Sequence, residues 1–484
     1  MCPHATTKEL TSDLSIKQEY AADLGDKRRT RRAMELGLAL SRNPGLSLPK
    51  LLPDEADLEA AYRFIRNDSC DWREILAPHQ RQTIERSAAH DEVVVAHDTT
   101  TLSFRQYWSG IKRSNMAGLT SRTQGFFVHA SFAIGGDERP LPLGLVEARP
   151  FVHKSDIEDD EESLDFWDEE GGLFDNEKER WFSNVAYVDD LYAAKGIKPV
   201  HVMDREADSF GFLAWLVSND MRFVARGNTS RGAKVRGKLK EFGQVVAHLG
   251  ERFDLRDEKS KKTNPPRKAR TARLNVRAGK LELNGAKSAR DASFSPGGFE
   301  AQPEQLELHL VEVTEPNPPT GEKGVRWLLL TTEPIDTTEQ VLQIVEWYRR
   351  RWLIEEYFKA LKSGCRIQER QMESASNMLR ILALLVPAAW RLLLLRAIAT
   401  DMPEAHWSCV LTRLEFTLLT KRLPKARLRE NTTVEQVLRA IAKLGGHLPR
   451  NGRPGWQSLH TGWQRLSDLA IGARIMGAED AINP

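Results

Sequence analysis

The chain has 484 residues, of which 40% are hydrophobic and 29% are charged, and its formal net charge is +2. This length predicts two to four domains, and the composition is typical of a soluble protein with a buried core. No run of about 18 apolar residues is present and the N-terminus lacks a secretory pattern, so we expect neither a membrane span nor secretion. The most apolar stretch, residues 381–395, is interrupted by Arg391 and is expected to be a buried helix.

The cysteines and the charge distribution narrow the class of protein further. The four cysteines are scattered and include no C-x-x-C pair, which predicts neither a zinc site nor a disulfide framework and favours a cytoplasmic location. Residues 155–179 are strongly acidic, whereas residues 259–277 contain eight Lys or Arg and no acid. A nucleic-acid-binding protein can be neutral overall if its basic residues gather on one face. A solvated loop explains the basic run equally well.

The first 72 residues have helical character. A basic cluster at residues 27–32 follows Leu24-Gly25-Asp26 and leads into an apolar helical pattern, and Asp54 can cap a further helix. This pattern predicts a helical N-terminal DNA-binding domain over residues 1–72, in which basic side chains approach the DNA backbone. A charged surface helix without a partner would have the same pattern.

Strand character begins near Glu92. Residues 93–96 predict a short central strand that ends at His97-Asp98, and residues 198–203 predict another that ends at Asp204. Residues 125–135 and 141–150 predict the two strands between them.

The chain beyond Asp204 continues the alternation of helix and strand. We expect a helix starting at Asp208-Ser209, a strand over 221–226, a β-rich insertion at about 228–324 with a loop over 259–270, and a buried strand over 325–331. Asp336 and Glu339 predict the cap of one long helix over 337–362, and the remaining chain is largely helical. The alternation predicts an α/β fold with helical regions at both ends.

Three acidic residues are candidates for catalysis. Asp98 and Asp204 each end a predicted apolar strand, the edge of a sheet where ligands gather. Glu355 lies on the predicted long helix, in one stripe with Tyr348, Arg351 and Lys362. A salt-bridged surface helix is the alternative explanation of this stripe.

Three carboxylates suit a two-metal site for cutting a phosphodiester. Two divalent ions can activate a water and stabilise the leaving oxygen, and carboxylates are their natural ligands. We expect two Mg²⁺ ions, for which Mn²⁺ substitutes, bound by Asp98, Asp204 and Glu355. Arg351 and Lys362 would hold neighbouring phosphates, and Tyr348 would donate a hydrogen bond to another.

In the arrangement of these residues the sequence resembles the DDE transposases of the insertion-sequence-four family. The matching segments are His97-Asp98-Thr99-Thr100, Asp204-Arg205-Glu206-Ala207-Asp208, the Y-R-E-K signature formed by Tyr348, Arg351, Glu355 and Lys362, Leu24-Gly25-Asp26 with Arg28-Arg29-Thr30, residues 61–67, residues 327–331, and residues 369–373. They occur in the family's order up to about residue 375. The acidic segment 155–179 does not match, and the chain beyond about residue 400 matches only loosely.

The resemblance implies a fold, a reaction and partners. The fold is a ribonuclease H-like catalytic core over residues 73–400, carrying the β-rich insertion, with a helical C-terminal domain over 401–484 for dimerisation. The reaction is cut-and-paste transposition of double-stranded DNA by a synaptic homodimer, through a hairpin intermediate at the transposon end. No membrane partner is expected.

The resemblance also implies which residues contact DNA. Trp327 would receive a base flipped out as the hairpin forms, with Trp352 beside it, although core packing is an alternative for Trp327 because it begins an apolar strand. The full set of implied DNA contacts is Arg28, Arg29, Arg32, Arg226, Trp327, Tyr348, Arg351, Trp352 and Lys362.

Two other functions remain open at this point. One is a catalytically inactive, transposase-derived regulator that only binds DNA, although such remnants often lose one of the three carboxylates. The other is a structure-specific nuclease of the same fold that performs no strand transfer.

Overall fold

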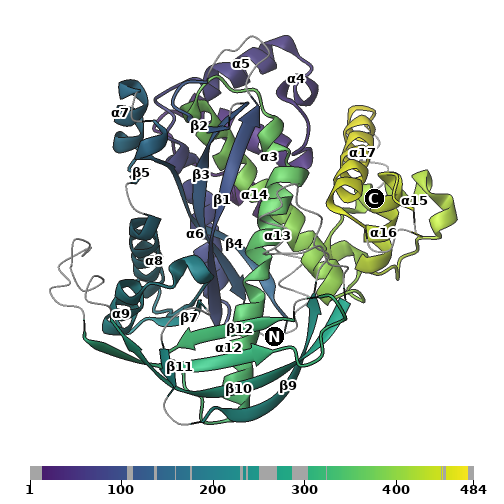
Figure 1. Cartoon of the computed structure of the whole chain (residues 1–484). Helices are drawn as coiled ribbons and strands as arrows, with labels where there is room; N and C mark the ends of the chain where they lie inside the picture. The colour runs from purple at the N-terminus through teal and green to yellow at the C-terminus, as the bar shows by residue number, and fades with distance from the viewer. Residues whose placement is uncertain are drawn as a thin grey trace. The chain divides into compact units, whose positions relative to one another are not determined.

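A computed structural model describes residues 13–105, 113–120, 122–135, 139–157, 160–174, 177–228, 233–235, 238–249, 270–285, 303–322, 324–448, 450 and 454–477. Figure 1 draws the chain from its N-terminus in purple to its C-terminus in yellow. The chain divides into two units: the first comprises Met1–Val93, Asp98–Asn176 and Leu353–Pro484, and the second comprises Val94–His97 and Glu177–Trp352. The basic segment 259–270 falls outside the described residues except for Arg270.

The N-terminal part of the first unit is helical, as predicted. Its helices are α2 (Asp13–Gln18), α3 (Lys27–Arg42), α4 (Leu48–Leu51), α5 (Glu55–Ile65) and α6 (Trp72–Ser87). Aspartates start three of them: Asp26 accepts hydrogen bonds from the first backbone N–H groups of α3, Asp54 does so for α5, and Asp71 for α6. Such caps satisfy donors that have no partner inside the helix.

The strands of the first unit lie in the order β5-β4-β3-β1, with β2 paired to β3. Strand β1 (Val93–Arg105) contributes its part from Asp98 onward, and the others are β2 (Ala117–Thr120), β3 (Thr123–Gly135), β4 (Leu141–His153) and β5 (Leu173–Phe174). Antiparallel pairing of β3 with β4 confirms the two strands predicted there. Helix α7 (Glu161–Glu169) occupies the acidic segment.

The rest of the first unit is built around one long apolar helix, α14 (Ala375–Asp401), which packs against α3, α6 and β4. By length and composition alone this helix could cross a membrane, but 83% of its most apolar window is buried inside the protein. It is therefore a core helix, as predicted for residues 381–395. Helices α13 (Trp352–Lys359), which begins one residue before the unit, α15 (Arg413–Arg422), α16 (Val434–Leu444) and α17 (Trp456–Ile475) complete this part.

A mixed sheet forms the second unit, with strand order β1-β6-β7-β12-β11-β10-β8, and β9 pairs with β10. The first three strands are parallel, and β7 pairs antiparallel with β12. The bounds are β6 (Val200–Met203), β7 (Arg222–Arg226), β8 (Ala233–Val235), β9 (Lys240–Leu249), β10 (Arg270–Asn284), β11 (Gln305–Thr314) and β12 (Arg326–Thr331). Strands β8 to β11 confirm the β-rich character predicted for the insertion.

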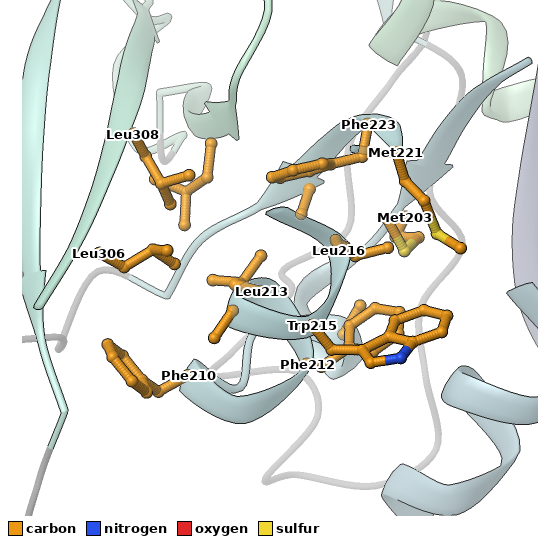
Figure 2. Packing of buried hydrophobic residues seen from close by; sticks show 14 of the residues in the cluster. Met203, Phe210, Phe212, Leu213, Trp215, Leu216, Met221, Phe223, Leu306 and Leu308 are labelled. Carbon is orange, nitrogen blue, oxygen red and sulfur yellow. The ribbon is translucent and has the colours of Figure 1, made fainter. Parts of the chain in front are cut away.

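Helices cover both faces of this sheet. Buried residues of α9 (Phe210–Ser218), among them Phe212 and Leu216, belong to one hydrophobic cluster with residues of the strands (Figure 2). Leu330 of β12 is part of this cluster, and Phe212 also contacts Phe182 of α8 (Glu177–Ala193). Trp327 lies three positions before Leu330 in β12 and therefore on the opposite face of the sheet, where it contacts Tyr348 of α12 (Thr338–Arg350). The sheet is therefore packed between the α9 cluster on one face and α12 on the other.

Three expectations about element boundaries were wrong. Strand β1 does not end at Asp98 but continues to Arg105. The predicted single helix over 337–362 is interrupted at Arg351, whose N–H bonds to Tyr348 O in a tighter turn, and it is followed by a π-helical turn at Ala360–Gly364. Its N-cap is Thr337, in a reciprocal capping box with Gln340, rather than Asp336 with Glu339.

Candidate active site

Asp204 lies directly after β6, as predicted, in the second unit. Its side chain is half-buried and caps the short 3-10 helix Arg205–Ala207, with Oδ1 accepting a hydrogen bond from Glu206 N at 2.8 Å. The backbone therefore orients one carboxylate oxygen at the carboxyl end of a buried parallel strand.

The segment Asp204-Arg205-Glu206-Ala207-Asp208 contains two further acids, and both make structural hydrogen bonds. Glu206 accepts a hydrogen bond from the buried Arg180 of α8 at 3.0 Å. Asp208 Oδ2 accepts one from Asn228 N, just beyond β7, at 2.7 Å. Of the three acids in the motif, Asp204 is thus the one placed at the strand end.

Positive charge collects near Asp204. Partial burial and the repulsion of Arg226 lower the pKa of Arg205, while the charges of Tyr348 and Asp204 oppose that shift. The Arg226 guanidinium donates a long hydrogen bond to Arg326 O at 3.4 Å, and its buried Nε has no hydrogen-bond partner among the described residues. A buried guanidinium N–H without an acceptor suits an anionic ligand.

An aromatic pair borders the same charges. The rings of Trp327 and Tyr348 have centroids 5.3 Å apart and are inclined by 60°. Tyr348 is buried, Trp327 is half-buried and Arg351 is half-buried in the turn after α12. Trp352, the next residue, leaves 46% of its surface exposed. The structure therefore brings the predicted contacts Arg226, Trp327 and Tyr348 into one region of the second unit.

Asp98 and Lys362 interact within the first unit. Asp98 is half-buried in β1, and its Oδ1 accepts a hydrogen bond from Thr99 N at 2.9 Å. Burial lowers the pKa of Lys362, and the negative charge of Asp98 opposes this shift, so the two charges lie within electrostatic range. Lys362 belongs to the π-helical turn, a local irregularity that is frequent at functional sites.

Glu355 is half-buried on α13, also in the first unit. The neighbouring Glu356 is committed to cations, with Lys359 Nζ at 2.7 Å and Arg396 Nη1 at 3.4 Å. Glu356 therefore links α13 to Arg396 of α14.

A buried histidine pair in the second unit was missed by the sequence analysis. His97 Nε2 lies 2.9 Å from His201 Nδ1, and His201 Nε2 lies 3.3 Å from Asp189 Oδ1 on α8. Both rings are fully buried and link β1 to β6 one residue before Asp98 and three before Asp204. The signal was a polar histidine in each of two otherwise apolar strands.

The N-terminal arginines differ in how far they are engaged. Arg28 is exposed, whereas Arg29 donates to Ser69 O at 2.8 Å. Arg32 forms ion pairs with Asp57 at 3.2 Å and Glu35 at 3.4 Å. Arg28 has the side chain most available to a ligand on the first turn of α3.

Two buried arginines beyond Lys362 reach into the N-terminal helices. Arg380 of α14 donates to Ile65 O at 2.9 Å and Cys70 O at 2.7 Å. Arg370 donates to Leu46 O at 2.5 Å and to Pro44 O. We call Arg370 and Arg380 the arginine clamp.

The metal site itself remains a prediction. Within the described ranges, no three His, Cys, Asp or Glu side chains form a group that could hold a metal ion. Asp98 and Glu355 belong to the first unit and Asp204 to the second. The donor chemistry fits magnesium, because all three residues offer carboxylate oxygens and two of them are oriented by backbone N–H groups.

Two protein-family models match the chain. The model described as transposase DNA-binding matches residues 16–70, and the model described as transposase DDE domain matches residues 190–388. The first match includes α3 with its basic first turn. The second includes Asp204, Glu355 and Lys362, and Asp98 precedes it.

Proposed function

Since the chain is a DDE transposase, a metal-dependent enzyme that cleaves DNA, we propose that it is a cut-and-paste transposase of the insertion-sequence-four family. It binds the terminal repeats of its transposon as a synaptic homodimer, cleaves double-stranded DNA through a hairpin intermediate and transfers the 3′ ends to a target. The observation that carries this proposal is the set around Asp204, where Arg205, Arg226, Tyr348 and Trp327 place cations and aromatic rings beside a strand-end carboxylate.

The proposed fold is a ribonuclease H-like core over residues 73–400, with the β-rich insertion at about 228–324, between a DNA-binding domain at 1–72 and a dimerisation domain at 401–484. The parallel order β1-β6-β7 supports such a core. The helical character of both ends supports the flanking domains.

The proposed metal ligands are Asp98, Asp204 and Glu355. In the parallel pairing of β1 with β6, Ala96 is opposite Val202. Asp98 lies two residues after Ala96, and Asp204 lies two residues after Val202. Two magnesium ions, for which manganese substitutes, supply when bound an activated water and stabilisation of the leaving oxygen.

The chain's own side chains hold the DNA end. Arg226, Arg351 and Lys362 neutralise phosphates, and Arg226 Nε offers a buried donor that a phosphate oxygen satisfies. The Trp327 ring, inclined by 60° to the Tyr348 ring, receives the flipped base, and the exposed Trp352 is proposed as a second contact to that base.

One assay tests the function. Full-length protein is incubated with Mg²⁺ and the terminal repeats that flank its coding region, and the products are separated on a denaturing gel. Nicks, hairpins and inserted products are expected. Cleavage without joining would indicate a nuclease, and binding without cleavage a regulator; either result would overturn the proposal.

The carboxylate assignment is tested by Asp98→Asn, Asp204→Asn and Glu355→Gln. Each change keeps the size of the side chain but removes an anionic metal ligand, so cleavage should fall by at least about 10²-fold while binding of the terminal repeats persists. Asp220→Asn is the matched control, because Asp220 is exposed and its ion pair, with Lys198, lies on the surface. Near-normal cleavage by any of the three variants would exclude that residue as a ligand.

A further inference from the structure

An exposed basic ridge lies in the C-terminal part of the first unit, and the function above makes no use of it. It consists of five cations within nine residues, at the end of α15 and the turn that follows: Lys421, Arg422, Lys425, Arg427 and Arg429. All five side chains belong to exposed residues, and the segment 416–429 contains no acid.

The backbone under the ridge is ordered by local hydrogen bonds. Leu423 N bonds to Leu419 O at the end of α15, and the 3-10 turn Pro424–Ala426 follows. Arg427 adopts φ = +52°, which is unusual for a residue with a side chain, while Leu428 is buried beneath it. Arg429 N is held by Thr432 Oγ1 at 2.7 Å. The five charges are therefore displayed on a shaped surface rather than on a free run of chain.

The acids nearest in sequence are already committed elsewhere. Glu415 closes the capping box of α15 with Thr412, and Glu430 pairs with Arg413 at 2.6 Å. In the part of the chain that the structure describes, the five ridge side chains form no ion pair or hydrogen bond. Five like charges kept together without counter-charges favour a polyanionic partner.

The ridge is separate from the basic first turn of α3. The C-terminal end of α3 (Ser41, Arg42) and the N-terminal end of α15 (Thr412, Glu415) line one pocket. The two basic surfaces lie at the other ends of these helices, which at 1.5 Å per residue are about 24 Å and about 15 Å long. The ridge and the basic first turn of α3 therefore belong to different helices, and each presents its own cluster of cations.

We propose that the basic ridge binds the phosphate backbone of a second stretch of duplex DNA. Mixed Lys and Arg side chains suit phosphates, and the absence of an aromatic residue from 421–429 favours a duplex over a single strand, whose bases would need a stacking surface. This inference rests on the proposed function, because the same phosphates can belong to the flank of a bound transposon end or to the target.

The test replaces the five cations together in the full-length protein, as Lys421→Gln, Arg422→Gln, Lys425→Gln, Arg427→Asn and Arg429→Gln. Asn is chosen at 427 because it tolerates the left-handed conformation. The matched control removes five exposed cations at scattered positions: Arg81→Gln, Lys154→Gln, Lys240→Gln, Arg439→Gln and Lys443→Gln. Both proteins therefore lose the same charge, and thermal unfolding verifies that both fold.

Binding is measured in EDTA, so the result does not depend on cleavage. One arm uses a labelled terminal repeat with and without flanking duplex, and the other offers a labelled unrelated duplex to protein already saturated with unlabelled ends. The ridge variant should lose roughly 2–4 units from the slope of log K against log salt in one arm, as expected for a few lost phosphate contacts. Loss in the first arm assigns the ridge to the flank, and loss in the second assigns it to the target. Slopes equal to those of the scattered control in both arms would overturn the proposal, whatever the cleavage assay shows.

Discussion

Within the D-R-E-A-D segment, three acidic side chains have three different physical roles. Asp204 caps a turn at the end of β6, Glu206 neutralises a buried arginine, and Asp208 accepts a backbone hydrogen bond. The sequence alone identified Asp204, because it directly follows an apolar strand. The partners of the other two lie 26 and 20 residues away, and no local pattern indicates them.

Replacement of Trp327 should separate two steps of the reaction. In Trp327→Ala the flipped base loses its stacking partner, worth roughly 1–3 kcal/mol, so hairpin formation should slow by about 5-fold to 150-fold while first-strand nicking is unchanged. Single-turnover gels with a terminal-repeat duplex measure both steps. Trp327→Phe should recover part of the rate. An equal slowing of nicking and hairpin formation would show instead that Trp327 packs the strand it begins.

Glu147 of β4 makes the stability of the protein depend on pH. Burial raises the pKa of its carboxyl from 4.5 to about 7, against the opposing charge of Arg149. Between pH 4.5 and about 7 the Glu147 carboxyl is ionised in the unfolded chain but protonated in the folded protein. The free energy of unfolding therefore falls as pH rises through this range. Glu147→Gln should unfold with about 1–3 kcal/mol more free energy at pH 8 than the parent protein, and with no gain at pH 4.5.

Urea denaturation at several pH values, followed by a spectroscopic signal from the first unit, measures the free energy of unfolding. The exposed Glu59→Gln provides the control, and its free energy of unfolding should follow that of the parent protein at every pH. Parallel pH profiles for the parent protein and Glu147→Gln would contradict the assignment.

At the scale of elements, the arginine clamp joins α14 and the 3-10 turn before it to main-chain atoms of the N-terminal helices and their connecting loops. Arg380→Met would leave the carbonyls of Ile65 and Cys70 buried without donors, at a cost of about 1–3 kcal/mol each. The free energy of unfolding should therefore fall by about 2–4 kcal/mol, as measured by chemical denaturation. Arg439→Met, at an exposed i,i+4 pair, should change it by less than about 0.5 kcal/mol. Equal free energies of unfolding for the two variants would show that Arg380 does not stabilise the protein through these hydrogen bonds.

Elements with strong apolar runs were predictable, and those with polar interruptions were not. Residues 200–203 and 222–226 are short, buried strands, as their sequences indicated. The polar run that begins at Asp98 hid the second half of β1, where buried and half-buried residues alternate beside β3. The interruption at Arg351 had no sequence signal, because no Pro or Gly lies near it, and tertiary packing decides it.

At the scale of the whole molecule, the transposase DNA-binding model and the transposase DDE-domain model match different regions, residues 16–70 and 190–388. Arg28→Gln should therefore weaken binding of the terminal repeat in EDTA and make its salt dependence shallower by roughly one unit, as for one lost phosphate contact. Fluorescence anisotropy at several salt concentrations measures this. Lys50→Gln, also exposed in the same region, is the control. A salt slope identical to that of the parent protein would remove Arg28 from the DNA interface.

DNA binding and DNA cleavage should also differ in their requirement for divalent metal ions. Chelation of divalent ions should leave binding of the terminal repeats intact and abolish cleavage, because phosphate contacts by arginines need no metal, whereas water activation does. Restoring Mg²⁺ should recover cleavage. Binding that disappeared with the metal would place the ions in recognition as well as in chemistry.

The arginine clamp has a consequence for how such a protein can diverge. Its acceptors are the peptide carbonyls of Pro44, Leu46, Ile65 and Cys70, which every amino acid supplies. Mutations that replace side chains in the DNA-binding region therefore leave these hydrogen bonds intact, so long as the backbone path is kept. The surface that this region presents to DNA can change in sequence while its packing against α14 stays the same.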